Sequence, residues 1–222
     1  MKIEVKSIKK KYGKKEVLKD ITFSAQSGKC IGILGTNGCG KSTLLSILAG
    51  IQPADGGEFL YNGKNLFEYT SQRAKIVGYV PQGTPLIEEL NAKDNLSLWY
   101  GKDEMESQLN GGVLKLLGIG DFLKTPVSKM SGGMKKRLSI GCAIAKRPPI
   151  LLLDEPMAAL DIVCKQKISN YIKKHKEDGG IVFLSTHDVL ELELCDEFYI
   201  IKNGILESFQ YNGNIESLVK SL

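Results

Sequence analysis

The sequence feature that most restricts the fold is the glycine-rich run GTNGCGKST at residues 35–43. A short apolar run, CIGILG, leads into it, and the segment KSTLLSILA has helical character until Gly50 and Pro53 stop it. Glycines let backbone N–H groups turn toward phosphate oxygens, and the start of the helix adds partial positive charge. The run therefore predicts a strand, a phosphate-binding loop and a helix, in that order.

Two side chains of this loop have specific expected roles. Lys41 is expected to reach the β- and γ-phosphates of ATP, and Ser42 is expected to ligate Mg²⁺. GTPases, kinases and helicases also carry such a loop, so by itself it does not choose among them. The loop residues expected to contact the nucleotide are Gly35, Thr36, Asn37, Gly38, Cys39, Gly40, Lys41, Ser42 and Thr43.

Composition and sequence pattern exclude several classes of protein. Of the 222 residues, 42% are hydrophobic and 25% are charged, as in an ordinary folded domain with a full core. The longest apolar run, Ile150–Leu153, is far shorter than the roughly 20 residues of a membrane-spanning helix. The start, MKIEVKSIKK, lacks the apolar stretch of a secretory signal, so we expect a cytosolic location. Five scattered cysteines without a CxxC pair disfavour a zinc site and a disulfide framework.

Strand-like and helical segments alternate along the chain. Residues 3–25 alternate polar with apolar residues around Tyr12 and Gly13, which predicts two antiparallel strands joined by a turn. Residues 92–146 contain several helical stretches, and a further helix is expected at about 163–177. This pattern indicates an α/β domain with a parallel core and a helical insertion. Further strands are expected at residues 57–62, 76–82, 150–153 and 181–185.

Several expected strands end in residues whose side chains can bind a metal or take part in a reaction. Asp154 ends the run ILLL and is followed by Glu155, while Gln82 ends IVGYVPQ and His187 ends IVFLSTH. The carboxyl ends of parallel strands meet at one edge of the sheet, so these side chains should converge beside Gly35. We expect Asp154 and Gln82 to bind the metal, and Glu155 to act as the base that orients the attacking water.

A second helix start is a candidate anion site. Ser131-Gly132-Gly133 precedes the helical run MKKRLSIGCAIAK, with Ser131 near its N-cap. One chain with one nucleotide does not need it. The triplet is therefore either an ordinary helix start or part of a site on another chain.

Taken in order, these sequences resemble the motif set of the ATP-binding-cassette (ABC) ATPases, and the resemblance covers essentially the whole chain. It implies a P-loop NTPase (RecA-like) core with an N-terminal antiparallel β subdomain and an inserted α-helical signature subdomain. The implied division is approximately 1–88 and 147–222 for the core and β subdomains, and 89–146 for the helical one. The matching segments are GTNGCGKST, Gln82, MSGGM at 130–134, ILLLDEP at 150–156 and His187.

The resemblance also implies a head-to-tail dimer, either a homodimer or a cassette heterodimer, with ATP held between phosphate loops and opposing signatures. Ser131, Gly132 and Gly133 would then contact the γ-phosphate across the interface. Tyr12 matches the aromatic residue that stacks on adenine, and Asp161 matches the acidic residue that communicates across the dimer.

Four positions depart from the family pattern. Met134 stands where the signature usually has glutamine, which leaves the serine and glycines unchanged. Met157, Ala158 and Ala159 replace the commoner polar and glycine residues after the glutamate. Because Glu155 and His187 are both present, we expect ATP hydrolysis with Glu155, His187 and Lys41 as catalytic residues.

The resemblance favours the ATPase subunit of a membrane transporter, held on the cytoplasmic face of the membrane by a separate permease subunit. The segment DNLSLWYG at 94–101 resembles bacterial export ATPases, and Pro85–Leu90 would lie near the groove that receives the permease. The alternative is a non-transport ABC ATPase of DNA repair or translation. Such proteins usually carry a coiled coil, a zinc module or a second cassette, none of which is recognisable here, and no nucleic-acid partner is expected. A small-molecule kinase would not need the Ser-Gly-Gly helix.

Overall fold

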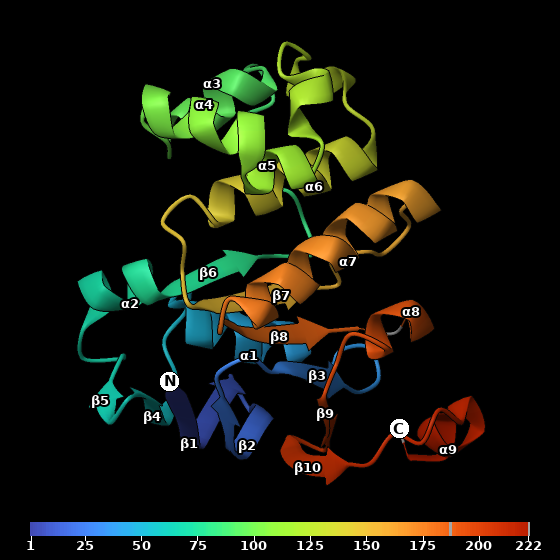
Figure 1. Cartoon of the computed structure of the whole chain (residues 1–222). Coiled ribbons are helices and arrows are strands. Elements are labelled where there is room, and N and C mark those ends of the chain that lie inside the picture. Colours follow the sequence, from blue (N-terminus) through green and yellow to red (C-terminus); the bar gives the residue numbers. More distant parts are fainter. Residues whose placement is uncertain (187, 222) are drawn as a thin grey trace.

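The phosphate loop leaves the carboxyl end of β3 (Cys30–Leu34), near the centre of a sheet with helices on both faces (Figure 1). The computed structural model describes residues 1–186 and 188–221, and within them the sheet has ten strands in the order β5-β4-β1-β2-β10-β9-β3-β8-β7-β6. The other strands are β1 (Lys2–Tyr12), β2 (Lys15–Gln26), β4 (Gly56–Tyr61), β5 (Lys64–Asn65), β6 (Val77–Val80), β7 (Ile150–Asp154), β8 (Ile181–Ser185), β9 (Glu197–Lys202) and β10 (Ile205–Phe209).

Parallel strands form the half of the sheet that carries the loop. β3 pairs in parallel with β8 and β9, and β7 pairs in parallel with β6 and β8. Every residue of β3, β7 and β8 is buried. The continuous apolar runs of the sequence are thus explained, because both faces of these strands are covered. This half of the sheet is the parallel core of an α/β fold, as predicted.

Two hydrophobic layers cover the two faces of this half-sheet. Leu152 and Phe183 point into a layer shared with α1 (Lys41–Ala49) and with β1, β2 and β4. Leu151 and Leu153 point into the other layer, which includes α6 (Gly132–Ala143) and α7 (Ile162–Glu177). The alternation follows the two-residue period of a strand. The phosphate-loop helix α1 and the signature helix α6 therefore lie on opposite faces of the same strands.

The antiparallel strands at the amino end match the prediction. β1 and β2 pair around a turn in which Tyr12 lies opposite Lys15 and Gly13 has a φ of 58°. A left-handed conformation at that position suits glycine. β4 extends this unit on one side, and β2 joins β10 through the pair Ile205 and Asp20, so all the strands belong to one sheet.

Residues 92–143 form a helical group above the sheet in Figure 1. Arg137 of α6 anchors it: its guanidinium lies 4.9 Å from the Phe122 ring centre and donates to Leu117 O at 2.7 Å. The interior is apolar and includes Leu96, Leu114 and Leu138. The members are α3 (Ala92–Ser97), α4 (Lys102–Gly111), α5 (Val113–Leu116), the 3₁₀ turns η1 (Ile119–Phe122) and η2 (Val127–Lys129), and α6.

The structure differs from the sequence-based expectations in the following places. The strand expected at 76–82 spans only Val77–Val80, because Ile76 ends the helix α2 (Thr70–Ile76), and neither α2 nor β5 was predicted. No elements were predicted after the strand at 181–185, where the structure has β9, β10, α8 (Val189–Leu192) and α9 (Ile215–Ser221). None of the helices within the described residues has the length and apolar character needed to cross a bilayer.

Candidate functional site

The phosphate loop is shaped by backbone conformations that only glycine adopts readily. Gly35 has a φ of 146° and Gly40, the N-cap of α1, has a φ of 117°. A Cβ at position 40 would lie 2.8 Å from a methyl carbon of Leu18, so a larger residue would also collide with β2. The loop closes on itself through a hydrogen bond from Cys39 N to Thr36 O of 3.2 Å. This curvature leaves the N-terminus of α1 facing the cavity.

Lys41 lies across the loop with its ammonium turned inward. The residue is only 5% exposed, and its Nζ donates to Gly35 O at 2.8 Å and to Thr36 O at 3.3 Å. An ammonium held by carbonyl oxygens of the loop is well placed to exchange them for phosphate oxygens. The structure therefore brings this lysine to the point where the sequence predicted phosphate.

A cavity of about 420 Å³ lies beside the loop. It is lined by Gln82 and Glu155 as well as by loop residues, although these two lie far from the loop in sequence. Gln82 Nε2 donates to Glu155 Oε2 at 2.8 Å. The predicted convergence of strand ends is thus present for these two side chains. The loop residues lining the cavity are Asn37, Gly38, Gly40, Lys41, Ser42 and Thr43.

Asp154 is held at the end of β7 by a residue that the sequence analysis did not select. Ser185 of β8 lies directly opposite, is fully buried, and donates its hydroxyl proton to Asp154 Oδ1. The same hydroxyl accepts from Glu155 N at 3.2 Å. Glu155 has a φ of 46°, a left-handed conformation that turns the chain at this point. One serine therefore fixes both acidic residues.

The oxygen atoms around the cavity fit Mg²⁺. Magnesium is usually held by one or two carboxylates together with phosphates and waters. Ser42 and Gln82 line the cavity and the buried Asp154 lies next to Glu155 in the chain. No cluster of three or more His, Cys, Asp or Glu side chains that could hold a metal occurs in residues 1–186 and 188–221. A magnesium ion held here would take its remaining ligands from phosphates and water.

The Ser-Gly-Gly helix start lies away from this cavity. Ser131 is the N-cap of α6 and accepts from Met134 N at 3.2 Å, whereas neither it nor the two glycines line the cavity. Gly133 touches the start of α7, because a Cβ there would lie 2.5 Å from Cys164 Sγ. Asp161 caps α7 by accepting from Cys164 N at 2.9 Å. The predicted signature and Asp161 thus lie side by side on the surface.

The signature helix also holds the backbone of Gln82. Lys136 of α6 is 5% exposed, and its Nζ donates to Pro81 O and to Gln82 O, both at 2.9 Å. Burial lowers the pKa of the Lys136 ammonium, with nearby Asp154 opposing the shift. This lysine was not selected from the sequence, where it is one of three successive basic residues. It links the signature to the cavity through the interior of the domain.

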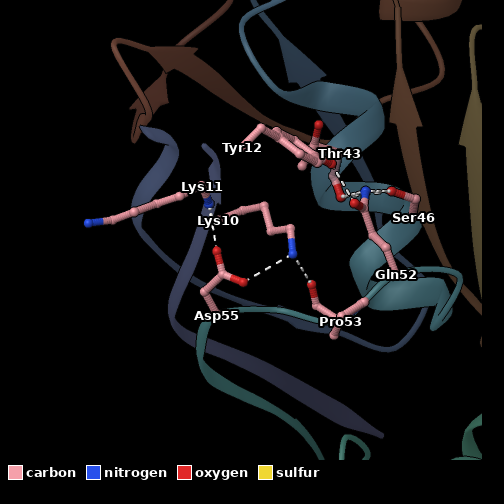
Figure 2. Close-up of polar contacts among 8 residues, drawn as sticks. All are labelled: Lys10, Lys11, Tyr12, Thr43, Ser46, Gln52, Pro53 and Asp55. Atoms are coloured by element: carbon pink, nitrogen blue, oxygen red, sulfur yellow. Dashed lines mark hydrogen bonds and ion pairs between the residues drawn. The ribbon is translucent and has the colours of Figure 1, made fainter. Parts of the chain in front are cut away.

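Tyr12 lies near the phosphate-loop helix but does not line the cavity. It is 49% exposed at the end of β1 and donates its hydroxyl proton to Gln52 Oε1. Figure 2 shows this contact with Gln52, next to α1. His187, the remaining predicted site residue, lies outside the described residues.

A buried glutamate supports the turn that follows Glu155. Glu191 of α8 is 1% exposed and its Oε1 accepts from Met157 N at 2.8 Å. Burial raises the pKa of Glu191 to about 7, although hydrogen bonds from Thr186 and Met157 favour the charged form. Met157, one of the departures from the family pattern, is itself fully buried in the core.

Comparison with known proteins identifies the family. The family model described as "ABC transporter" matches residues 18–158, which is more than half of the chain. The chain belongs to this ABC transporter family. It is therefore an ATP-binding cassette, the ATP-hydrolysing subunit of such transporters, and the predicted family and function are confirmed.

The relatives of this cassette include proteins named for antibiotic resistance, for lantibiotic transport and for import. It is 36% identical over 207 residues to the linearmycin resistance ATP-binding protein LnrL of Bacillus subtilis, covering 91% of this chain and 67% of LnrL. It is 30% identical over 220 residues to the lantibiotic transport ATP-binding protein SrtF of Streptococcus pyogenes, covering 97% and 95%. It is 35% identical over 228 residues to the spermidine/putrescine import protein PotA of Bacteroides thetaiotaomicron. That match covers 98% of this cassette but only about half, 49%, of PotA.

A solved structure agrees with the fold. A dimeric ATP-binding cassette in a post-hydrolysis state with ADP and Pi superimposes with a TM-score of 0.80 at 27% identity, covering 94% of this chain and 99% of that chain. A larger cavity of about 580 Å³ lies between α4 and α7, but it contains none of the phosphate-loop residues. The smaller cavity beside Lys41 contains the phosphate-loop residues and is therefore the candidate nucleotide site.

Replacing Ser185 with alanine tests the serine bridge. Ser185→Ala removes a donor to the Asp154 carboxylate and an acceptor for Glu155 N, so we expect kcat for ATP hydrolysis to fall about tenfold or more. Equilibrium binding of ATP without Mg²⁺ should change little, because the phosphate loop is untouched. The exposed Ser208→Ala variant on β10 is the control. An unchanged kcat in Ser185→Ala would show that the bridge is dispensable.

Replacing Glu191 with glutamine tests its raised pKa. An acid with a raised folded-state pKa contributes stability that is fully present below about pH 4.5 and lost as pH rises through about 7. The difference in free energy of unfolding, wild type minus Glu191→Gln, should therefore fall by up to about 3 kcal/mol across this range. Urea denaturation at successive pH values measures it, with the exposed Glu193→Gln as control. A difference independent of pH would contradict the assignment.

Proposed function

We propose that this cassette powers transport of a substrate across a membrane by ATP-driven closure of two cassettes. The observation that supports this proposal is that Lys41 and Ser131 lie apart within one chain. The phosphate loop lines a cavity, whereas the start of the signature helix is exposed outside that cavity. A helix N-terminus with an exposed serine and glycine can bind an anion that approaches from outside the domain. The phosphate loop of a second copy, or of a partner cassette, would bring that anion.

The residues around the cavity divide the work of holding the nucleotide. Lys41 would bind the β- and γ-phosphates, while Ser42, Gln82 and Asp154 would hold Mg²⁺. The ion would supply positive charge that stabilises the phosphates during transfer. Ser185 would keep the Asp154 carboxylate oriented, because its hydroxyl already donates to that group.

Hydrolysis would depend on Glu155 at the mouth of the cavity. Its carboxylate is held by the Gln82 amide at 2.8 Å, which fixes its direction before substrate arrives. Glu155 would then accept a proton from the attacking water, with His187 completing the site as the sequence predicts. Ser131, Gly132 and Gly133 of the other copy would contact the γ-phosphate, Asp161 would lie at that interface, and Tyr12 would stack on adenine.

A separate membrane-spanning permease is the proposed partner, with the cassette on the cytoplasmic face. The segment Pro85–Leu90 is the proposed contact, and it is firmly positioned: buried Asn95 bonds to both Ile87 N and Ile87 O, at 3.0 and 3.1 Å. Leu98 and Trp99, 59% and 55% exposed, add apolar surface on the same subdomain. Export is favoured because LnrL and SrtF are named for resistance and lantibiotic transport.

The variant Glu155→Gln tests the hydrolytic mechanism. Glutamine cannot accept the proton, so ATP binding should persist while steady-state turnover falls at least about a hundredfold. The trapped ATP state should run as a dimer in size-exclusion chromatography with Mg²⁺ and ATP. The exposed Glu58→Gln on β4 is the matched control. A Glu155→Gln chain that remains monomeric and hydrolyses ATP at the original rate would refute both the role and the dimer.

Isolation from membranes tests the transport role. The tagged chain, purified from its own cells in mild detergent, should bring down a multi-spanning membrane protein in a constant ratio. Trp99→Asp should reduce that recovery, because a charge would replace apolar contact surface. Retained ATPase activity would show that this variant is folded. Recovery of nucleic acid or ribosomes instead would favour the non-transport class.

A further inference from the structure

The loop that follows the phosphate-loop helix folds back along it. Helix α1 ends at Ala49, and Gly50 takes a left-handed φ of 84°. Gly50 N bonds to Ile47 O at 3.0 Å and Ile51 N bonds to Ser46 O at 2.9 Å, so the chain reverses at this point. Gln52 is thereby placed beside the helix, between α1 and the end of β1 (Figure 2).

The hydrogen-bond directions in this loop are determined by one hydroxyl. Ser46 Oγ donates its single proton to Thr43 O at 3.0 Å, so it must accept from Gln52 Nε2. Gln52 therefore presents its amide oxygen on the other side, and Tyr12 must donate its hydroxyl proton to it. A directed relay thus runs from Tyr12 to the carbonyl of a phosphate-loop residue.

A second set of contacts fixes the strand that carries Tyr12. The ammonium of Lys10, a residue 7% exposed, donates to Pro53 O at 2.8 Å and to Asp55 Oδ1 at 3.1 Å. Asp55 Oδ2 accepts from Lys11 N at 2.7 Å, and this bond lowers the pKa of the Asp55 carboxyl. The Lys10 ammonium also lies 5.7 Å from the centre of the Tyr12 ring. One face of that ring is occupied, while 49% of the residue stays exposed.

We propose that Gln52 is a positioning residue for the nucleotide, which holds the Tyr12 ring in the orientation that stacks on the base. The proposal rests on the proposed stacking role of Tyr12. A bond between partly exposed groups adds little to the stability of the fold, but it removes rotational freedom that base binding would otherwise have to remove. Because Lys10 covers one face of the ring, the base uses the other.

Steady-state kinetics of the purified chain tests this positioning role. Gln52→Met keeps the length of the side chain and loses its hydrogen bonds to Tyr12, Ser46 and Thr43, so KM for ATP should rise about three- to tenfold while kcat stays within about twofold. Tyr12→Phe, which keeps the ring, should raise KM equally, and the double variant should show no further rise. The matched control is Gln26→Met, an exposed glutamine at the opposite end of the β1–β2 pair.

The outcomes separate this proposal from the one on which it rests. An unchanged KM in Gln52→Met, with a raised KM in Tyr12→Ala, overturns the positioning role and leaves stacking intact. A rise caused by Gln52→Met in the Tyr12→Ala background also overturns it, because Gln52 would then act without Tyr12. An unchanged KM in Tyr12→Ala removes the stacking role itself. If Gln52→Met does not fold, Gln52→Leu serves instead, since it likewise removes the acceptor of the Tyr12 hydroxyl; an unchanged KM there overturns the proposal.

Discussion

The burial of both faces of the central parallel strands is the constraint on which the site depends. Strands covered on two sides cannot expose polar side chains along their length, so polar groups collect where the strands end. The phosphate loop follows β3, Asp154 and Glu155 lie at the end of β7, and Gln82 lies just after β6. The two core layers that flank these strands hold their ends in register. The cavity is therefore a consequence of how the core is packed.

Buried polar side chains connect this edge to its surroundings. Ser185 joins two neighbouring strand ends through one hydroxyl, and Lys136 carries the connection to the signature helix through the carbonyls beside Gln82. Removing one partner of such a bond leaves the other unsatisfied in the interior, which costs more than the bond itself contributes. The nucleotide site and the surface that would meet a second cassette thus share a continuous set of hydrogen bonds. The post-hydrolysis dimer with the same fold shows that cassettes of this type meet in pairs.

The sequence predicted the parts of this arrangement that depend on neighbours in the chain. The glycine loop, its helix and the acidic pair after ILLL are short patterns whose geometry is local. Ser185 and Lys136 could not be selected, because their partners lie 31 and about 55 residues away and each looks ordinary in its own segment. β9 shows the same limit: EFYIIK has a strand composition, but only its pairing with β3, across some 166 residues, reveals its place in the sheet. The roles of the site residues remain predictions.

The contact between Gly133 and Cys164 has a consequence for how this sequence can diverge. The two residues belong to different helices, yet a single carbon atom added at the first would enter the space of the sulfur at the second. Position 133 can accept a side chain only where the sulfur of Cys164 rotates away, position 164 becomes smaller or the two helices separate. Among relatives with the same backbone, these positions should therefore vary together. The distance between the caps Ser131 and Asp161 would then depend on positions 133 and 164 together, and a change at one position would be matched by a change at the other.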